Sequence, residues 1–152
     1  MNSRPDPLPV SEAANRVWSA VEAAGDPGIR GADIRDTQHL TRSQFENGKA
    51  HVRDHRCADE GKCFVYDGDV YAVTRDPGRS AQSMALKMRP IDRQLARLHK
   101  SACAPIADDG VSDAAFRYIK RQLEAMIDNL TIMRDSGYSI HSKRIREAAQ
   151  AR

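Results

Sequence analysis

The sequence predicts a mainly α-helical fold with a small two-stranded β-hairpin between the helices. Apolar residues recur at helical spacing over residues 10–55, and again in a more regular pattern after residue 112. Between these regions, residues 63–74 are rich in β-branched and aromatic side chains on both sides of Asp67-Gly68. This combination indicates helices, then a hairpin, then further helices.

The composition indicates a small cytoplasmic protein. The 152 residues carry 24 lysines and arginines against 21 aspartates and glutamates, a net charge of +3. No apolar run approaches the roughly 20 residues of a membrane span, and residues 1–9 lack the apolar stretch of a signal peptide. The three cysteines have no disulfide-framework spacing, which favours a reducing compartment. We therefore expect a cytoplasmic, nucleoid-associated protein without a membrane partner.

Two helices are expected in the first forty residues. Residues 1–9, rich in proline, form a flexible arm, and Ser11 caps a helix over residues 11–24 with Trp18 inward. The Gly25-Asp-Pro-Gly28 turn ends this helix, and a short helix follows at about 30–37.

Residues 41–55 are expected to form a recognition helix. Thr41 and Gln44 have the spacing of a capping box, while Leu40 and Phe45 are placed to form a hydrophobic staple. Phe45 and Val52 give this helix a narrow apolar stripe, and its other side is polar. Helix, turn, short helix, turn and capped polar helix is the helix-turn-helix pattern, whose last helix reads the major groove.

The hairpin completes a second pattern. Asp67-Gly68 between the runs at 63–66 and 69–74 is typical of a type I′ turn, which needs φ > 0 at both positions. With the pattern Ile29…Ile34…Leu40-Thr-Arg-Ser-Gln-Phe45…Val52, this hairpin resembles the winged helix-turn-helix superfamily over residues 10–75. The resemblance implies DNA in contact with the recognition helix and the hairpin. The side chains expected to bind DNA are Arg42, Ser43, Gln44, Asn47, Lys49, Arg53, Lys62 and Arg75.

Charge complicates the role of the hairpin. Residues 41–56 carry 4 basic and 2 acidic side chains, whereas residues 57–80 carry 3 basic and 5 acidic ones. Asp67 and Asp69 would repel phosphates at the hairpin tip. Lys62, Arg75 and Arg79 are therefore the better phosphate ligands, and docking to another protein remains an alternative.

The second half is expected to be helical and to dimerise. Pro90 interrupts an apolar pattern over residues 80–100, which predicts two short helices or one sharp kink. A later helix, capped by Ser112 and stopped at Gly137, repeats apolar residues at alternating steps of three and four, like heptad positions a and d. The expected dimer seam is Phe116, Ile119, Leu123, Met126, Leu130 and Met133.

Motifs for chemistry are sparse. His51, His55, Cys57 and Cys63 fall close together, but they lack common zinc-finger spacing, so whether they bind a metal stays open. The sequence has no P-loop, nucleophile elbow or paired-carboxylate motif. We expect neither an enzyme nor a cofactor.

These observations predict four regions. They are a flexible arm at 1–9, a winged helix-turn-helix domain at 10–78, a helical dimerisation region at 79–138 and a basic helical tail at 139–152. The expected function is a homodimeric regulator of transcription, repressor-like and of bacterial, phage or plasmid type, that binds double-stranded DNA with sequence specificity. The alternative is a protein-interaction or DNA-architecture module without a catalytic role.

Overall fold

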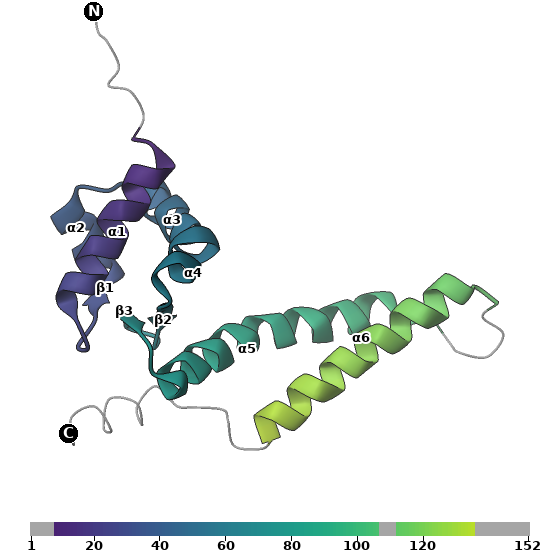
Figure 1. Ribbon diagram of the computed structural model, residues 1–152. Helices are drawn as coiled ribbons and strands as arrows, with labels where there is room; N and C mark the ends of the chain where they lie inside the picture. The colour runs from purple at the N-terminus through teal and green to yellow at the C-terminus, as the bar shows by residue number, and fades with distance from the viewer. Residues whose placement is uncertain (1–7, 107–111, 136–152) are drawn as a thin grey trace, which may run out of the picture. The chain divides into compact units, whose positions relative to one another are not determined.

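The computed structural model describes residues 8–106 and 112–135, and it confirms a mainly helical fold with a small antiparallel sheet. The chain divides into two compact units, Met1–Ser83 and Met84–Arg152. Most of the expected arm at 1–9, Gly137 and the expected tail at 139–152 lie outside the described residues. The elements of the first unit are α1 (Val10–Ala24), β1 (Ile29–Arg30), α2 (Gly31–Gln38), α3 (Arg42–His51), η1 (Val52–Arg56), α4 (Cys57–Glu60), β2 (Cys63–Tyr66) and β3 (Val70–Thr74) (Figure 1).

Helix α1 is the centre of the first unit's core. Val17 and Val21 are fully buried, and Trp18 is buried beside them, as the helical spacing predicts. The helix begins one residue earlier than expected: Pro9 is its N-cap, and the Pro9 carbonyl accepts a hydrogen bond from the Ala13 N–H at 3.0 Å. The prediction of a Ser11 cap is therefore wrong. The other core residues are Ala13, Ala14, Ala20, Ile34, Leu40, Phe45, Val52 and Phe64.

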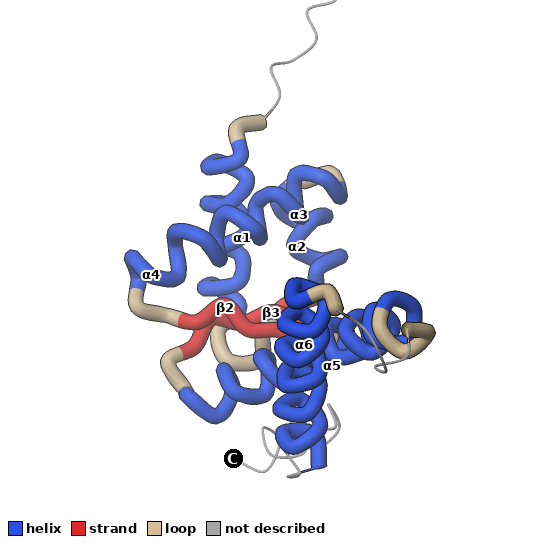
Figure 2. Tube along the Cα trace, turned by 90° about the vertical axis from the view of Figure 1, so that its right-hand side faces the viewer, coloured by secondary structure: helices blue, strands red, loops and turns tan. Residues whose placement is uncertain are grey.

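The sheet has three antiparallel strands in the order β1-β3-β2, one more than the sequence predicts. Strand β1 pairs Ile29 with Tyr71 of β3 and Arg30 with Val70. Strands β2 and β3 lie side by side (Figure 2), with Phe64 opposite Val73. A strand of two residues is too short to show an alternating pattern, so only its pairing with β3 reveals it.

A single helix, α5 (Pro77–Ala102), begins in the first unit and continues into the second. Pro77 occupies its first turn, where the missing N–H costs nothing, and the Asp76 carboxylate accepts a hydrogen bond from the Gly78 N–H at 2.8 Å. Pro90 lies inside this helix, so the expected division into two short helices is wrong. Half-buried Met88 and Leu95 continue the same apolar side past Pro90, and this packing outweighs the local preference.

In the second unit, α6 (Ala114–Met133) runs antiparallel to α5. The cap is Asp113 rather than the predicted Ser112, because the Asp113 carboxylate accepts a hydrogen bond from the Phe116 N–H at 2.6 Å. The antiparallel direction follows from two side-chain contacts: Arg134 contacts Asp92 at 3.2 Å, and Glu124 contacts His99 at 3.1 Å. Among the described residues, no helix has the length and apolar character needed to cross a membrane.

Candidate functional site

The start of α3 is fixed by its own side chains. The Gln44 N–H donates to the Thr41 hydroxyl at 3.2 Å, while the Thr41 N–H donates to the Gln44 side-chain oxygen at 2.9 Å. The predicted capping box is therefore confirmed. Leu40 and Phe45 on either side of it are both buried in the core. Because the Gln44 amide oxygen is used in the cap, this side chain contributes to the position of α3.

One side of α3 packs closely on α1. Phe45 and Val52 are buried, and Gly48 lies so near that a Cβ there would come within 3.0 Å of the Ala13 carbonyl carbon and oxygen. Glycine thus permits a backbone approach that any larger residue would obstruct. Figure 1 shows α1 and α3 next to one another in the first unit.

Lys49 does not lie on the exposed side of α3. Its residue is only 6% exposed, so the prediction that it lies on an exposed DNA-facing surface is wrong. The ammonium group donates to the Tyr71 hydroxyl at 3.1 Å and contacts a Glu46 carboxylate oxygen at 3.0 Å. It also lies 4.6 Å from the centre of the Phe45 ring, a cation–π distance. Glu46 has the i, i+3 spacing of a helical ion pair, whereas Tyr71 is 22 residues away and gives no such signal in the sequence.

The other predicted residues of α3 and η1 form an exposed polar surface. Arg42, Ser43 and Asn47 are exposed on α3, and Arg53 is exposed on the turn that follows. The Arg53 guanidinium lies 5.8 Å from the centre of the Phe64 ring, which links η1 to β2. These four side chains lie away from the Phe45–Val52 stripe and offer donors and acceptors to solvent. We call Arg42, Ser43, Asn47 and Arg53 the polar face.

The helix does not end at residue 55. A π-helical turn, η1, and then α4 carry it to Glu60, where Gly61 stops it with a φ of 57°. The helical segment is therefore longer than the helix expected over residues 41–55. On this segment, the centres of the His51 and His55 rings lie 4.6 Å apart. In the described part of the chain, which includes Cys57 and Cys63, no three His, Cys, Asp or Glu side chains form a metal-binding group.

The hairpin turn lies one residue later than predicted. The register places Gly68-Asp69 in the two-residue loop, and only Gly68, with a φ of 101°, has positive φ there. The type I′ prediction for Asp67-Gly68 is wrong because the Asp67 carboxylate closes the turn. It accepts hydrogen bonds from the Asp69 and Val70 N–H groups, each at 2.9 Å. The Asp67 carboxylate is thus satisfied within the turn.

Lys62 and Arg75, two of the expected phosphate ligands, are engaged within the protein. Lys62 contacts Glu22 at 2.6 Å, and this hydrogen bond lowers the pKa of the Glu22 carboxyl below its ordinary value. The Arg75 guanidinium donates to the carbonyls of Gly61 at 3.3 Å and Glu60 at 3.4 Å. Both side chains therefore hold the end of α4 in place.

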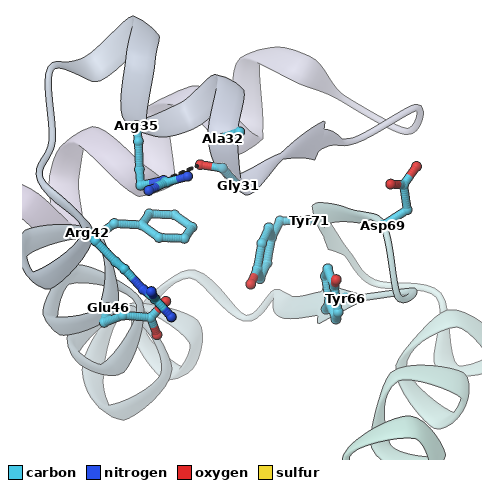
Figure 3. Close-up of a pocket in the computed structure, with 9 residues that line it drawn as sticks. Gly31, Ala32, Arg35, Arg42, Glu46, Tyr66, Asp69 and Tyr71 are labelled. Atoms are coloured by element: carbon cyan, nitrogen blue, oxygen red, sulfur yellow. Dashed lines mark hydrogen bonds between the residues drawn. The ribbon is translucent and has the colours of Figure 1, made fainter.

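A pocket of about 300 Å³ lies where α2, α3 and the sheet meet. Figure 3 shows Arg42 and Glu46 on its α3 side and Tyr66 and Tyr71 on its strand side. Burial raises the pKa of the Tyr66 hydroxyl, with smaller contributions from Tyr71 and the nearby carboxylates. The pocket is edged by charge of both signs, and sequence reasoning missed it because its lining comes from separate elements.

The expected dimer seam on α6 is divided by the structure. Leu123 is only 5% exposed within the single chain, so the expectation that all six residues await a partner is wrong for Leu123. Phe116, Leu130 and Met133 are half-buried. Ile119 and Met126, by contrast, are 62% and 49% exposed.

In the comparisons with known proteins, no family model, no curated protein and no solved structure matches the chain.

Proposed function

We propose that this chain is a winged helix-turn-helix protein that binds double-stranded DNA at specific sequences and regulates transcription as a homodimer. The observation that carries the proposal is the two-sided character of α3. Its Phe45 side packs on α1, while the polar face is exposed. A helix held rigidly on one side and rich in donors on the other suits the major groove.

The order of the elements supports the winged-helix part of the proposal. Helix, strand, two helices and two strands follow one another, with β1 paired to β3 in the sheet. Strand β1 lies directly before α2 and pairs with β3 of the hairpin. This pairing fixes the hairpin relative to α2 and α3. These features agree with the resemblance seen in the sequence.

The chemistry of the polar face supports sequence-specific reading. An arginine such as Arg42 can bind the O6 and N7 of guanine with two hydrogen bonds, and an asparagine such as Asn47 can do the same with adenine. The hairpin tip is less suited to DNA, because Asp67 and Asp69 would repel phosphates. Asp69 lies 3.6 Å from Arg30, which offsets part of this charge. Sequence specificity is therefore assigned to α3.

An exposed apolar stripe on each helix of the second unit supports dimerisation. On α5, Ile91 directly precedes Asp92, which contacts Arg134 at the end of α6. Leu98 likewise precedes His99, which contacts Glu124 of α6. On α6, Ile119 precedes Lys120, whose side chain is only 15% exposed. One residue corresponds to a rotation of about 100° around a helix axis. The stripe on each helix is therefore rotated by about 100°, in the same sense along the chain, from the side that contacts the other helix. Since the helices are antiparallel, both stripes lie on one side of the pair.

We call this side the apolar face; its exposed members are Met84, Ile91, Leu98, Ile119 and Met126. In the described part of the second unit, only two apolar side chains are buried within the single chain, Cys103 and Leu123. So small a core requires a further apolar surface. A second copy supplies it, because a two-fold axis brings equal faces together.

The proposed mechanism is steric. A two-fold dimer would place two copies of α3 about 34 Å apart, one helical turn, on a near-palindromic operator and block polymerase. Selection from a library of randomised duplexes tests the proposal. We expect enrichment of one near-palindromic sequence with half-sites one turn apart. A library that shows no enrichment after repeated rounds would overturn it in favour of a protein-interaction module.

A further inference from the structure

Helix α5 is far more basic than the rest of the chain. It contains six lysines and arginines and one carboxylate, Asp92. Four of these cations follow one another at steps of four, four and three residues, so they share one side of the helix. They are Arg89, Arg93, Arg97 and Lys100, all exposed, and we call them the basic ridge.

The basic ridge lies on the side of the helix pair opposite the apolar face. Asp92 and His99 are the α5 residues that contact the α6 side. Arg93 and Lys100 directly follow these two residues, whereas Ile91 and Leu98 of the apolar face directly precede them. The ridge is therefore turned about 100° from the contact between α5 and α6, in the other direction. Neither the second helix nor the apolar face covers it.

The nearby carboxylates are directed elsewhere. Asp92 contacts Arg134 at 3.2 Å, and Glu124 contacts His99 at 3.1 Å and Lys120 at 3.9 Å. Within residues 8–106 and 112–135, Arg93, Arg97 and Lys100 form no ion pair. Such a row of uncompensated positive charge has a strong electrostatic attraction for a polyanion.

We propose that the basic ridge binds the phosphodiester backbone of nucleic acid, as a surface separate from the polar face of α3. From Arg89 to Lys100 the ridge is roughly 16 Å long at about 1.5 Å per residue. One DNA strand carries a phosphate about every 3.4 Å of helix axis, so several phosphates lie within this length. Three of the four cations are arginines, whose guanidinium groups bind phosphate oxygens with two parallel hydrogen bonds.

The side chains around the ridge favour nucleic acid over an anionic membrane. Helices that lie in a membrane surface combine basic residues with tryptophan, phenylalanine or leucine that enter the lipid. Helix α5 has no Trp, Phe or Tyr, and its exposed Ile91 and Leu98 lie on the opposite side from the ridge. The inference rests on the proposed function only for its choice of duplex DNA as the probe.

The basic ridge would add a contribution to DNA affinity that does not depend on base sequence.

The test compares two double variants of the full chain with equal loss of charge. Arg93→Gln with Arg97→Gln removes two ridge cations, whereas Arg16→Gln with Arg134→Gln removes two arginines already paired, with Glu12 at 2.9 Å and Asp92 at 3.2 Å. Binding to a mixed-sequence duplex of about 30 base pairs, three helical turns, is measured over a series of salt concentrations. Circular dichroism verifies that each variant is folded.

The ridge variant should lower the magnitude of the slope of log K against log salt by up to about 1.8, since each phosphate contact contributes roughly 0.9. The control variant should keep the wild-type slope. Equal slopes in all three proteins, or no duplex binding by the wild type, would overturn the inference. It would also be overturned if the ridge variant lost binding to vesicles of phosphatidylcholine and phosphatidylserine in equal parts but kept duplex binding. The duplex has mixed sequence, so a negative result here would not exclude sequence-specific binding by α3. That binding is tested separately by the selection from randomised duplexes.

Discussion

The ammonium group of Lys49 on α3 donates a hydrogen bond to the hydroxyl of Tyr71 on β3 at 3.1 Å. The same ammonium lies over the rings of Phe45 and Tyr71, at 4.6 Å and 5.1 Å from their centres. Tyr71 also pairs with Ile29 of β1 in the sheet. The buried Lys49 ammonium therefore connects α3, the proposed recognition helix, to β3, the central strand of the sheet.

Removal of this acceptor should destabilise the first unit. Tyr71→Phe is expected to lower the free energy of unfolding by about 1–3 kcal/mol, because a buried ammonium loses a hydrogen-bond partner. Tyr66→Phe in the neighbouring strand is the control and should change stability by less than about 0.5 kcal/mol. Urea denaturation measures both. Equal midpoints for the two variants would show that the Lys49–Tyr71 contact contributes little.

Gly48→Ala should also be destabilising, against the usual trend. In an exposed helix interior, alanine in place of glycine gains roughly 1 kcal/mol. At residue 48 the new Cβ would lie 3.0 Å from the Ala13 carbonyl, so α1 and α3 must separate. We expect a net loss of about 1–3 kcal/mol, the range for overpacked cores. Asn47→Ala on the exposed side, measured by the same denaturation, should not destabilise, and a stabilised Gly48→Ala variant would contradict the close packing.

The contact between Lys62 and Glu22 predicts a pH dependence. The hydrogen bond from Lys62 lowers the pKa of Glu22 in the folded protein, so it contributes stability above the unfolded-state pKa of glutamate. This stability is lost as pH falls through the lower, folded-state pKa. Lys62→Gln should raise the pKa of Glu22 toward its ordinary value in a carbon-detected NMR titration. An unchanged pKa in the variant would show that Lys62 is not the cause.

The apolar face predicts which substitutions should separate the proposed dimer. Ile119→Gln with Met126→Gln should yield a folded monomer, because both side chains are exposed within one chain. Leu123→Gln should instead destabilise the helix pair itself, because Leu123 is buried there. Sedimentation and helical content distinguish the two results. A wild-type chain that sediments as a monomer at high micromolar concentration would exclude the proposed dimer.

The features predicted correctly from the sequence are those with local causes. The capping box of Thr41 and Gln44 needs only residues three apart, and the buried Trp18 follows from the spacing of one helix. The hairpin was predicted in place, but its loop differs by one residue because the Asp67 carboxylate binds the turn. A side-chain hydrogen bond of this kind is invisible in a pattern of residue types.

The features missed depend on contacts between distant residues. Strand β1 exists through its pairing with Tyr71 and Val70. Lys49 resembles an exposed lysine in sequence, and its burial depends on Tyr71, 22 residues away. Leu123 belongs to a heptad pattern that is equally compatible with a partner helix in the same chain or in a second copy. Only the position of α5 decides between these two.

The polar face of α3 is tested most directly by the binding of single variants to the selected duplex and to duplexes with one base pair changed. Arg42→Ala and Asn47→Ala should each lose roughly 1–3 kcal/mol of specific binding and should no longer distinguish the base pair that the lost side chain reads. Lys49→Met, a change at a buried residue of the same helix, is the control and should retain discrimination at every base pair. If folded Arg42→Ala and Asn47→Ala variants bind all of these duplexes as the wild type does, α3 is not the element that reads DNA.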